Sequence, residues 1–317
     1  MRQDEITDIV ERAAKLVAEQ YVFPEVAGRI AAHLGDRLRE GAYAGAADAA
    51  ALGALVTTDL QAANGDLHLR LKHHETPLAD VADDPAEAQF VQLAALTMGG
   101  VARVERLPGN VGLLEIAPYL FPPHLAGDLV TAALRLLAGT DALLLDLRGN
   151  RGGSPDMVAL VCGWFFAEPT HLHTMHERAG TTHQYWSAAW LPVPRYAPDK
   201  PVLVLTGPET FSGGEELAYD LQQLGRATVV GERTRGGAHP RVGHRLHPHL
   251  ELTVPVARPV NAASGTNWEG CGVAPDVETP AGAARDVAYR KALEALLAAD
   301  PRRPTAAEAR ETLAALA

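Results

Sequence analysis

The stretch ALLLDLRGNRGG (residues 142–153) decides the fold class of this chain. It opens with the unbroken apolar run from Ala142 to Leu145, which is typical of a strand buried on both faces of a parallel sheet. Three glycines then fall within five residues, and Pro155 begins a helical pattern that continues to Phe166. An apolar strand, a glycine-rich turn and a helix in this order are the repeating unit of an α/β fold.

The same unit recurs along the chain. Residues 201–205 predict a second buried strand, and a helical pattern covers residues 213–224. Residues 101–107 and 111–116 flank a Pro-Gly-Asn turn and predict a hairpin. The remaining predicted elements are a helix over 124–137, a strand over 227–230, an exposed-edge strand over 250–256, and helices over 285–299 and 305–316.

The N-terminal part has a different periodicity. Ile6, Val10, Ala13 and Val17 recur at helical spacing, and two further helical runs follow before the Asn64-Gly65 stop. We therefore divide the chain into an N-terminal helical bundle over residues 1–75, a linker and helix over 76–100, and an α/β core over 101–317.

Composition excludes several classes of protein. The chain has 317 residues, 47% of them hydrophobic, with a net charge of −11 and two cysteines. This balance argues against disorder, against a phosphate-tracking nucleic-acid binder and against a disulfide framework. The acidic start lacks a signal-peptide pattern, and no run approaches the length of a membrane span. We expect a cytoplasmic protein with neither nucleic acid nor a membrane as partner.

Two strand-to-helix junctions carry residues suited to chemistry, because α/β sites lie at the carboxyl ends of strands. Glycine-rich residues 146–153 fit an oxyanion hole or a phosphate site, and equally a plain tight turn. In TFSGGEE (residues 210–216), Ser212 is either a helix N-cap that forms a capping box with Glu215 or a nucleophile on a sharp turn. Residue pattern alone leaves both pairs of alternatives open.

Histidines offer a base, but thirteen of them make mere presence uninformative. His68 lies where a helix stops and a short strand begins, and a lone histidine usually has a structural or surface role. His247 and His249 could chelate zinc, yet no third ligand follows at a recognised spacing. We therefore expect no metal site and no cofactor. Cys271 is expected to be a buried small apolar residue rather than a nucleophile.

Several motifs together resemble a known family. DLRGNRGG (146–153), SGGE (212–215) and GRATVVGE (225–232) resemble the core of the tail-specific, or C-terminal processing, serine proteases, which share a ClpP/crotonase-like fold with tricorn protease. YVFPE (21–25), GDLHLR (65–70), GERTRGGAHP (231–240) and GTNWEG (265–270) are similar to the branch of interphotoreceptor retinoid-binding protein. The resemblance covers nearly the whole chain.

The resemblance implies a catalytic set. Relatives with a serine–lysine dyad carry lysine about 25 residues after the serine, where this chain has Gly237, so that mechanism is not expected. The resemblance implies instead Ser212 as the nucleophile, His68 as the base and Glu269 as the residue that orients the base. The oxyanion hole implied by the junctions consists of N–H groups of Gly213 and of Gly152 or Gly153.

The function implied is that of a serine hydrolase, most economically a peptidase acting on peptides or C-terminal segments. Only about 30 residues separate Leu71 from Val101, too few for the PDZ domain common in the family. Two alternatives stay open. One is a hydrolase or cyclase acting on a non-peptide acyl substrate. The other is a carrier of retinoids or fatty acids, with Trp164, Phe165, Phe166, Trp186 and Trp190 near an apolar pocket.

Overall fold

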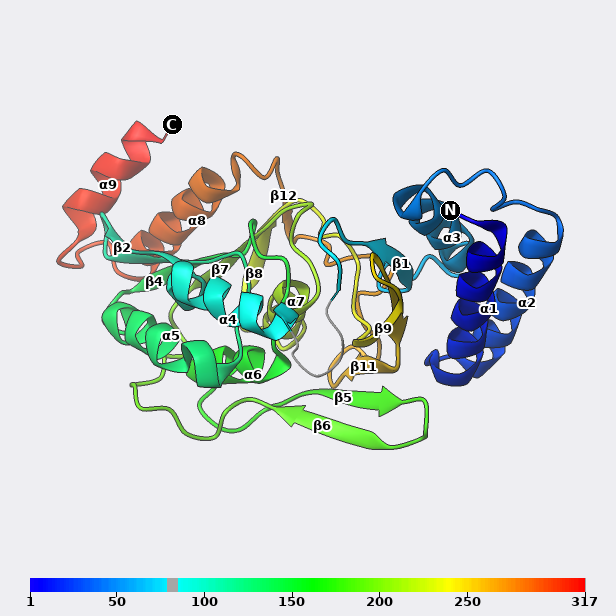
Figure 1. Cartoon of the computed structure of the whole chain (residues 1–317). Helices are drawn as coiled ribbons and strands as arrows, with labels where there is room; N and C mark the ends of the chain where they lie inside the picture. The colour runs from blue at the N-terminus through cyan, green and yellow to red at the C-terminus, as the bar shows by residue number, and fades with distance from the viewer. Residues whose placement is uncertain (79–84, 317) are drawn as a thin grey trace. The chain divides into compact units, whose positions relative to one another are not determined.

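The computed structural model describes residues 1–78 and 85–316, which form two compact units (Figure 1). The smaller unit consists of Met1–Gln89, Met175–His183 and His239–Val260. The larger unit consists of Phe90–Thr174, Gln184–Ala238 and Asn261–Ala317. The chain passes between them within β5 (His171–Glu177), β6 (Thr182–Trp186) and β11 (Ala257–Asn261), which form a sheet of order β11-β5-β6.

Three helices build most of the smaller unit: α1 (Gln3–Gln20), α2 (Pro24–Arg39) and α3 (Ala49–Gln61). The predicted apolar stripe of α1 is buried, and Pro24 occupies the first turn of α2, where its missing N–H costs nothing. Asp48 caps α3 by accepting a hydrogen bond from the Ala51 N–H at 2.8 Å. The predicted helical character of the N-terminal part is confirmed.

A small antiparallel sheet completes this unit, with the order β1-β10-β9. Its strands are β1 (Arg70–His73), β9 (Arg241–His247) and β10 (Leu250–Pro255). Leu71 pairs with Leu252, and both side chains join the apolar core of the helices. The prediction of β10 as an exposed edge is wrong, because β1 pairs with its outer side and makes it the central strand. This pairing also groups residues 239–260 with the N-terminal helices rather than with the α/β core.

The larger unit contains a six-stranded sheet of order β12-β8-β7-β4-β3-β2. Only the β2–β3 pair is antiparallel, and the other neighbours are parallel. Both central strands, β4 and β7, are buried along their whole length, as their unbroken apolar sequences predict. The strands are β2 (Val101–Leu107), β3 (Val111–Ile116), β4 (Ala142–Asp146), β7 (Val202–Thr206), β8 (Thr228–Gly231) and β12 (Val277–Glu278).

Helices cover both faces of this sheet. Leu143 and Leu145 point into a core shared with α5, α6 and α7, whereas Leu144 points into a core shared with α8. This alternation confirms the predicted α/β class. The helices of the unit are α4 (Pro85–Leu96), η1 (Met98–Gly100), α5 (Pro123–Leu137), α6 (Pro155–Phe165), α7 (Gly213–Gln223), α8 (Ala284–Ala299) and α9 (Ala306–Ala315).

Among the described residues, no helix combines the length and the apolar character needed to cross a membrane.

Candidate active site

Two loops of the larger unit meet at one edge of its sheet. Strands β4 and β7 are parallel, with Asp146 opposite Leu205, so the loops that follow them leave the sheet side by side. Thr210 Oγ1 donates to the Leu147 carbonyl at 2.9 Å, and the Phe211 N–H donates to the Asn150 carbonyl at 3.0 Å. The glycine-rich turn and the serine turn predicted from the sequence are thus hydrogen-bonded to each other.

Ser212 is the N-cap of α7, directly before Gly213, and has an unusual backbone. Its φ is +50° and its ψ is −119°, although N-cap residues ordinarily have extended backbone. The capping box is also present, and the Ser212 N–H donates to Glu215 Oε2 at 2.8 Å. Ser212 therefore caps a helix and lies on a strained turn. Its role as a nucleophile, the second alternative from the sequence, stays a prediction. Non-glycine residues held in such regions are concentrated at functional sites.

Glycine is required where the two turns touch. A Cβ atom on Gly152, whose φ is +118°, would lie 2.9 Å from Ser212 Cβ. A Cβ atom on Gly213 would lie 3.0 Å from the Gly153 nitrogen. The Gly152 N–H donates to Asn150 Oδ1 at 2.9 Å, whereas residues 1–78 and 85–316 supply no acceptor for the N–H of Gly153 or Gly213. Within the described part of the chain, the N–H groups of Gly153 and Gly213 are therefore left without an acceptor, unlike the Gly152 N–H.

Glu215 fastens this turn to a third loop. Its buried carboxylate accepts hydrogen bonds from Thr234 Oγ1 at 2.5 Å, the Gly236 N–H at 2.6 Å and the Gly237 N–H at 2.9 Å. Burial raises the pKa of Glu215, and these hydrogen bonds only partly oppose the rise. The sequence pattern predicts only a capping role for Glu215 and gives no sign of its contacts with residues 234–237.

Glu269 lies beside the same loop. Its Oε2 accepts a hydrogen bond from the Ala238 N–H at 2.5 Å, and the buried Trp268 ring donates to the Gly237 carbonyl at 2.9 Å. Residues 236–238 therefore connect the Ser212 turn, through Glu215, to Glu269. Cys271, two residues further on, is exposed, so the prediction that it is buried is wrong. Its backbone belongs to a surface turn, with its N–H on the Trp268 carbonyl at 3.3 Å.

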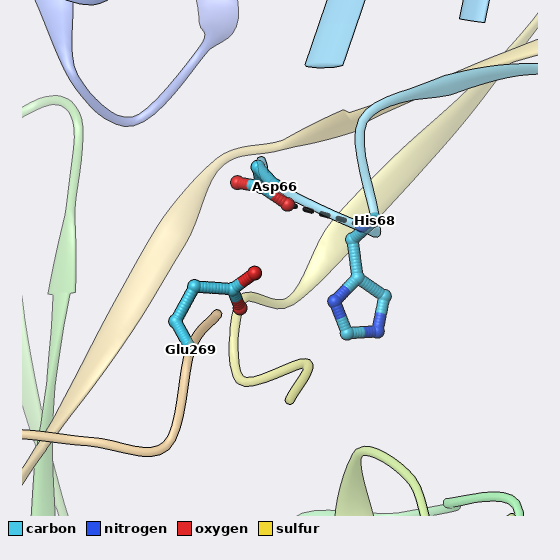
Figure 2. Close-up of side chains that lie close together, drawn as sticks. All are labelled: Asp66, His68 and Glu269. Atoms are coloured by element: carbon cyan, nitrogen blue, oxygen red, sulfur yellow. Dashed lines mark hydrogen bonds between the residues drawn. The ribbon is translucent and has the colours of Figure 1, made fainter. Parts of the chain in front are cut away.

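His68 belongs to the smaller unit, whereas the other predicted site residues belong to the larger one. Asp66 Oδ1 accepts a hydrogen bond from the His68 main-chain N–H at 3.0 Å (Figure 2), and Thr253 Oγ1 donates to the His68 carbonyl at 2.6 Å. The side chain is 7% exposed. Burial lowers the pKa of His68 to about 4, and the nearby Asp66 charge offsets only part of that effect. A neutral imidazole at physiological pH can accept a proton.

A second histidine of the smaller unit was not predicted. His239 Nδ1 lies 2.8 Å from Asp66 Oδ2, which also accepts a hydrogen bond from the Tyr21 hydroxyl at 2.9 Å. Burial acts to raise the pKa of Asp66, but these partners outweigh it and the pKa is lowered. Asp66 and His239 are 173 residues apart, and only the pairing of β1 with β10 brings their segments together.

Two of the aromatic residues considered for a ligand pocket belong to the core of the larger unit instead. Trp164 and Phe165 are buried in the core of the larger unit, and Trp164 packs on Tyr196 with ring centroids 4.7 Å apart. The Trp164 ring N–H donates to the Pro194 carbonyl at 2.8 Å. These two side chains therefore fill the core rather than line an apolar cavity.

Comparison with known families gives two matches. Residues 110–279 match the model of peptidase family S41, and residues 2–98 match the N-terminal domain of Peptidase_S41 in eukaryotic IRBP. A putative tricorn protease homolog 2 of Streptomyces coelicolor is 31% identical over 210 residues, which are 60% of this chain and 16% of that protein. A carboxyl-terminal-processing protease of Picosynechococcus is 30% identical over 166 residues, 50% of this chain and 38% of that protein. The chain thus spans well under half the length of these relatives.

Solved structures share the fold. A putative peptidase from Parabacteroides merdae superimposes with a TM-score of 0.60 at 17% identity, covering 87% of this chain and 90% of its own. A photosystem II D1 C-terminal processing protease gives a TM-score of 0.53 at 18% identity, covering 87% and 93%. These likenesses confirm the predicted ClpP/crotonase-like fold.

Proposed function

Because the chain belongs to peptidase family S41, as the match over residues 110–279 shows, we propose that it is a serine hydrolase that cleaves peptides with Ser212 as its nucleophile. The observation that carries the proposal is the backbone of Ser212, which has a φ of +50° at the start of α7. A nucleophile on a sharp strand-to-helix turn projects its hydroxyl away from the backbone and lies beside main-chain N–H groups. Ser212 lies on the turn between β7 and α7, and a Cβ atom on the adjacent Gly213 would lie 3.0 Å from the Gly153 nitrogen.

The N–H groups of Gly213 and Gly153 form the oxyanion hole in this proposal. Both lack an acceptor among the described residues, and the Gly152 N–H is already bound to Asn150 Oδ1. The structural detail therefore favours Gly153 over Gly152, a choice that the sequence left open. A donor of this kind typically contributes about 3 kcal/mol to the transition state of acyl transfer.

His68 is assigned as the general base and Glu269 as the residue that orients it. In acylation, Ser212 Oγ forms a bond to the carbonyl carbon while its proton passes to the imidazole. The bond from carbon to the leaving nitrogen then breaks as the imidazolium returns the proton to that nitrogen. In deacylation, water attacks the acyl carbon while its proton passes to the imidazole. The bond from carbon to Ser212 Oγ then breaks, Oγ regains the proton, and the carboxylic acid product leaves. With its pKa lowered to about 4 by burial, His68 is neutral at physiological pH, which is the protonation state that a base needs before the reaction.

A lysine base is not part of the proposal. Position 237, where lysine-dependent relatives place that residue, is glycine, and its N–H donates to Glu215 at 2.9 Å. Arg233 and Arg235 nearby stay protonated and cannot act as bases.

We propose that the substrate is a peptide or the C-terminal segment of a protein. The test is mass spectrometry of a diverse peptide library incubated with the purified full chain, with Ser212→Ala and His68→Ala variants. Ser154→Ala is the matched control, since Ser154 is also an N-cap in this unit but has an ordinary φ of −78°. Cleavage by the wild type and the control but by neither active-site variant supports the proposal. Hydrolysis of simple esters with no peptide cleaved would show a non-peptide acyl hydrolase instead.

A further inference from the structure

A second group of ionisable side chains lies inside the larger unit and includes two acids of α7, the helix that begins after Ser212. His173 is on β5, and Glu216 and Asp220 are on α7. The two acids are four residues apart, so they share one face of the helix. His173 and Asp220 are fully buried and Glu216 is 6% exposed. The proposed reaction uses none of the three.

Their polar atoms face one another without hydrogen bonds. His173 Nδ1 lies 3.8 Å from Glu216 Oε1 and 3.7 Å from Asp220 Oδ2. Among the described residues, these three atoms and His173 Nε2 have no hydrogen-bond partner. Buried polar atoms without partners are rare in native proteins, and each unsatisfied group costs about 1–3 kcal/mol. Several in one place indicate that something else occupies the space between them.

The separations fit a shared cation better than direct contact. Bonds of about 2.1 Å from zinc to nitrogen and oxygen ligands place two tetrahedral ligands about 3.4 Å apart. The three ligand atoms here all lie within 4.8 Å of one another. They are thus too far apart to hydrogen-bond and close enough to bind one ion after small side-chain movements.

The chemistry of the three side chains also fits a cation. They lie in a low-dielectric interior, which tolerates charge only when it is balanced. A divalent cation held by the two carboxylates and the neutral imidazole is balanced by the carboxylates and gives partners to His173 Nδ1, Glu216 Oε1 and Asp220 Oδ2 together. An imidazole with two carboxylates is a ligand set that suits zinc and its first-row neighbours.

We propose that His173, Glu216 and Asp220 bind one divalent transition-metal ion, with zinc as its representative, and so tie β5 to the helix that carries Ser212. This runs against the expectation from the sequence that the chain has no metal site.

Neighbouring residues hold the ligands in place. Asn261 Nδ2 donates to Asp220 Oδ1 at 2.8 Å and leaves Oδ2 for the ion. The Tyr185 ring stacks on the His173 ring at 4.8 Å between centroids. Outer contacts of this kind orient metal ligands, and their loss typically weakens binding by about 10–100-fold.

The test measures metal content, cobalt absorption and thermal melting of the full chain. After exposure to a chelator and reloading with zinc, the wild type should retain about one ion per chain on desalting. Glu216→Gln and Asp220→Asn keep the side-chain shapes but remove a charge, and each should lose the ion. The matched control is the double variant His247→Gln/His249→Gln, which removes the half-buried histidine pair of the smaller unit and should keep the ion.

Cobalt keeps the proposal testable where a variant does not fold. Cobalt-loaded wild type should show visible absorption bands of a low-symmetry nitrogen and oxygen site, and zinc should raise its melting temperature. The proposal is overturned if the reloaded wild type holds no ion and zinc leaves its melting unchanged. It is equally overturned if the ion persists in folded Glu216→Gln and disappears from the His247/His249 variant, which would place the ion on that histidine pair.

Discussion

Replacing Ser212 by glycine should stabilise the protein relative to Ser212→Ala while both variants lose activity. Alanine at a φ of +50° and a ψ of −119° keeps the backbone strain of the native serine, which costs about 1–3 kcal/mol at such positions. Glycine adopts this conformation freely. Both substitutions remove the hydroxyl and its share of the capping box, so the difference between the two variants isolates the backbone.

An ordinary N-cap supplies the baseline for that difference. At an unstrained N-cap, a protein with glycine is about 0.7 kcal/mol more stable than the same protein with alanine. Ser154 begins α6 in the same unit with a φ of −78°, so Ser154→Gly and Ser154→Ala measure this baseline. At Ser212 the advantage of glycine should reach about 2 kcal/mol or more, the sum of the baseline and the relieved strain.

Urea unfolding followed by tryptophan fluorescence gives the free energies, since all four tryptophans lie in the larger unit. The slopes of the transitions must match before free energies are compared. Equal glycine-over-alanine differences at positions 212 and 154 would refute the argument that Ser212 is held in a strained turn.

Three further changes test the site. Burial lowers the pKa of His68 to about 4, so kcat/KM should rise as the pH increases through about 4 and then stay level, because the protonated ring cannot accept a proton. A kcat/KM that does not fall at low pH would contradict His68 as the base, and a midpoint near the ordinary 6.5 would show that burial does not lower its pKa. Gly213→Ala puts a methyl group 3.0 Å from the Gly153 nitrogen and should lower kcat by roughly 100-fold, whereas Gly28→Ala, in open space on α2, should leave it unchanged. Glu215→Gln sets an amide donor against the donors of residues 234–237 and should cost about 2–3 kcal/mol of unfolding free energy, measured in urea; an unchanged midpoint would show that these contacts are weak.

The sequence predicted the parts of the fold that have a strong local signal. Strands β4 and β7 were recognised because unbroken apolar runs of that length are typical of buried parallel strands. The β10 strand was recognised as a strand but misplaced at an edge. Its position depends on pairing with β1, a four-residue strand about 180 residues earlier, and no local pattern encodes that partner.

The candidate site divides in the same way. The turns of Gly152 and Ser212 could be placed together because parallel neighbouring strands bring their carboxyl ends to one edge. The Asp66–His239 pair could not be found from spacing, since tertiary pairing alone unites its segments. The His173 group was missed because two acids at helical spacing usually mark an exposed face, whereas this part of α7 is buried.

Labelling with a fluorophosphonate probe tests most directly the central claim that Ser212 is the nucleophile. The purified wild-type chain should take up the probe, and mass spectrometry should map the adduct to Ser212, with no labelling of Ser212→Ala and retained labelling of Ser154→Ala. An adduct on another residue, or no adduct on a folded chain that cleaves peptides, would contradict the account.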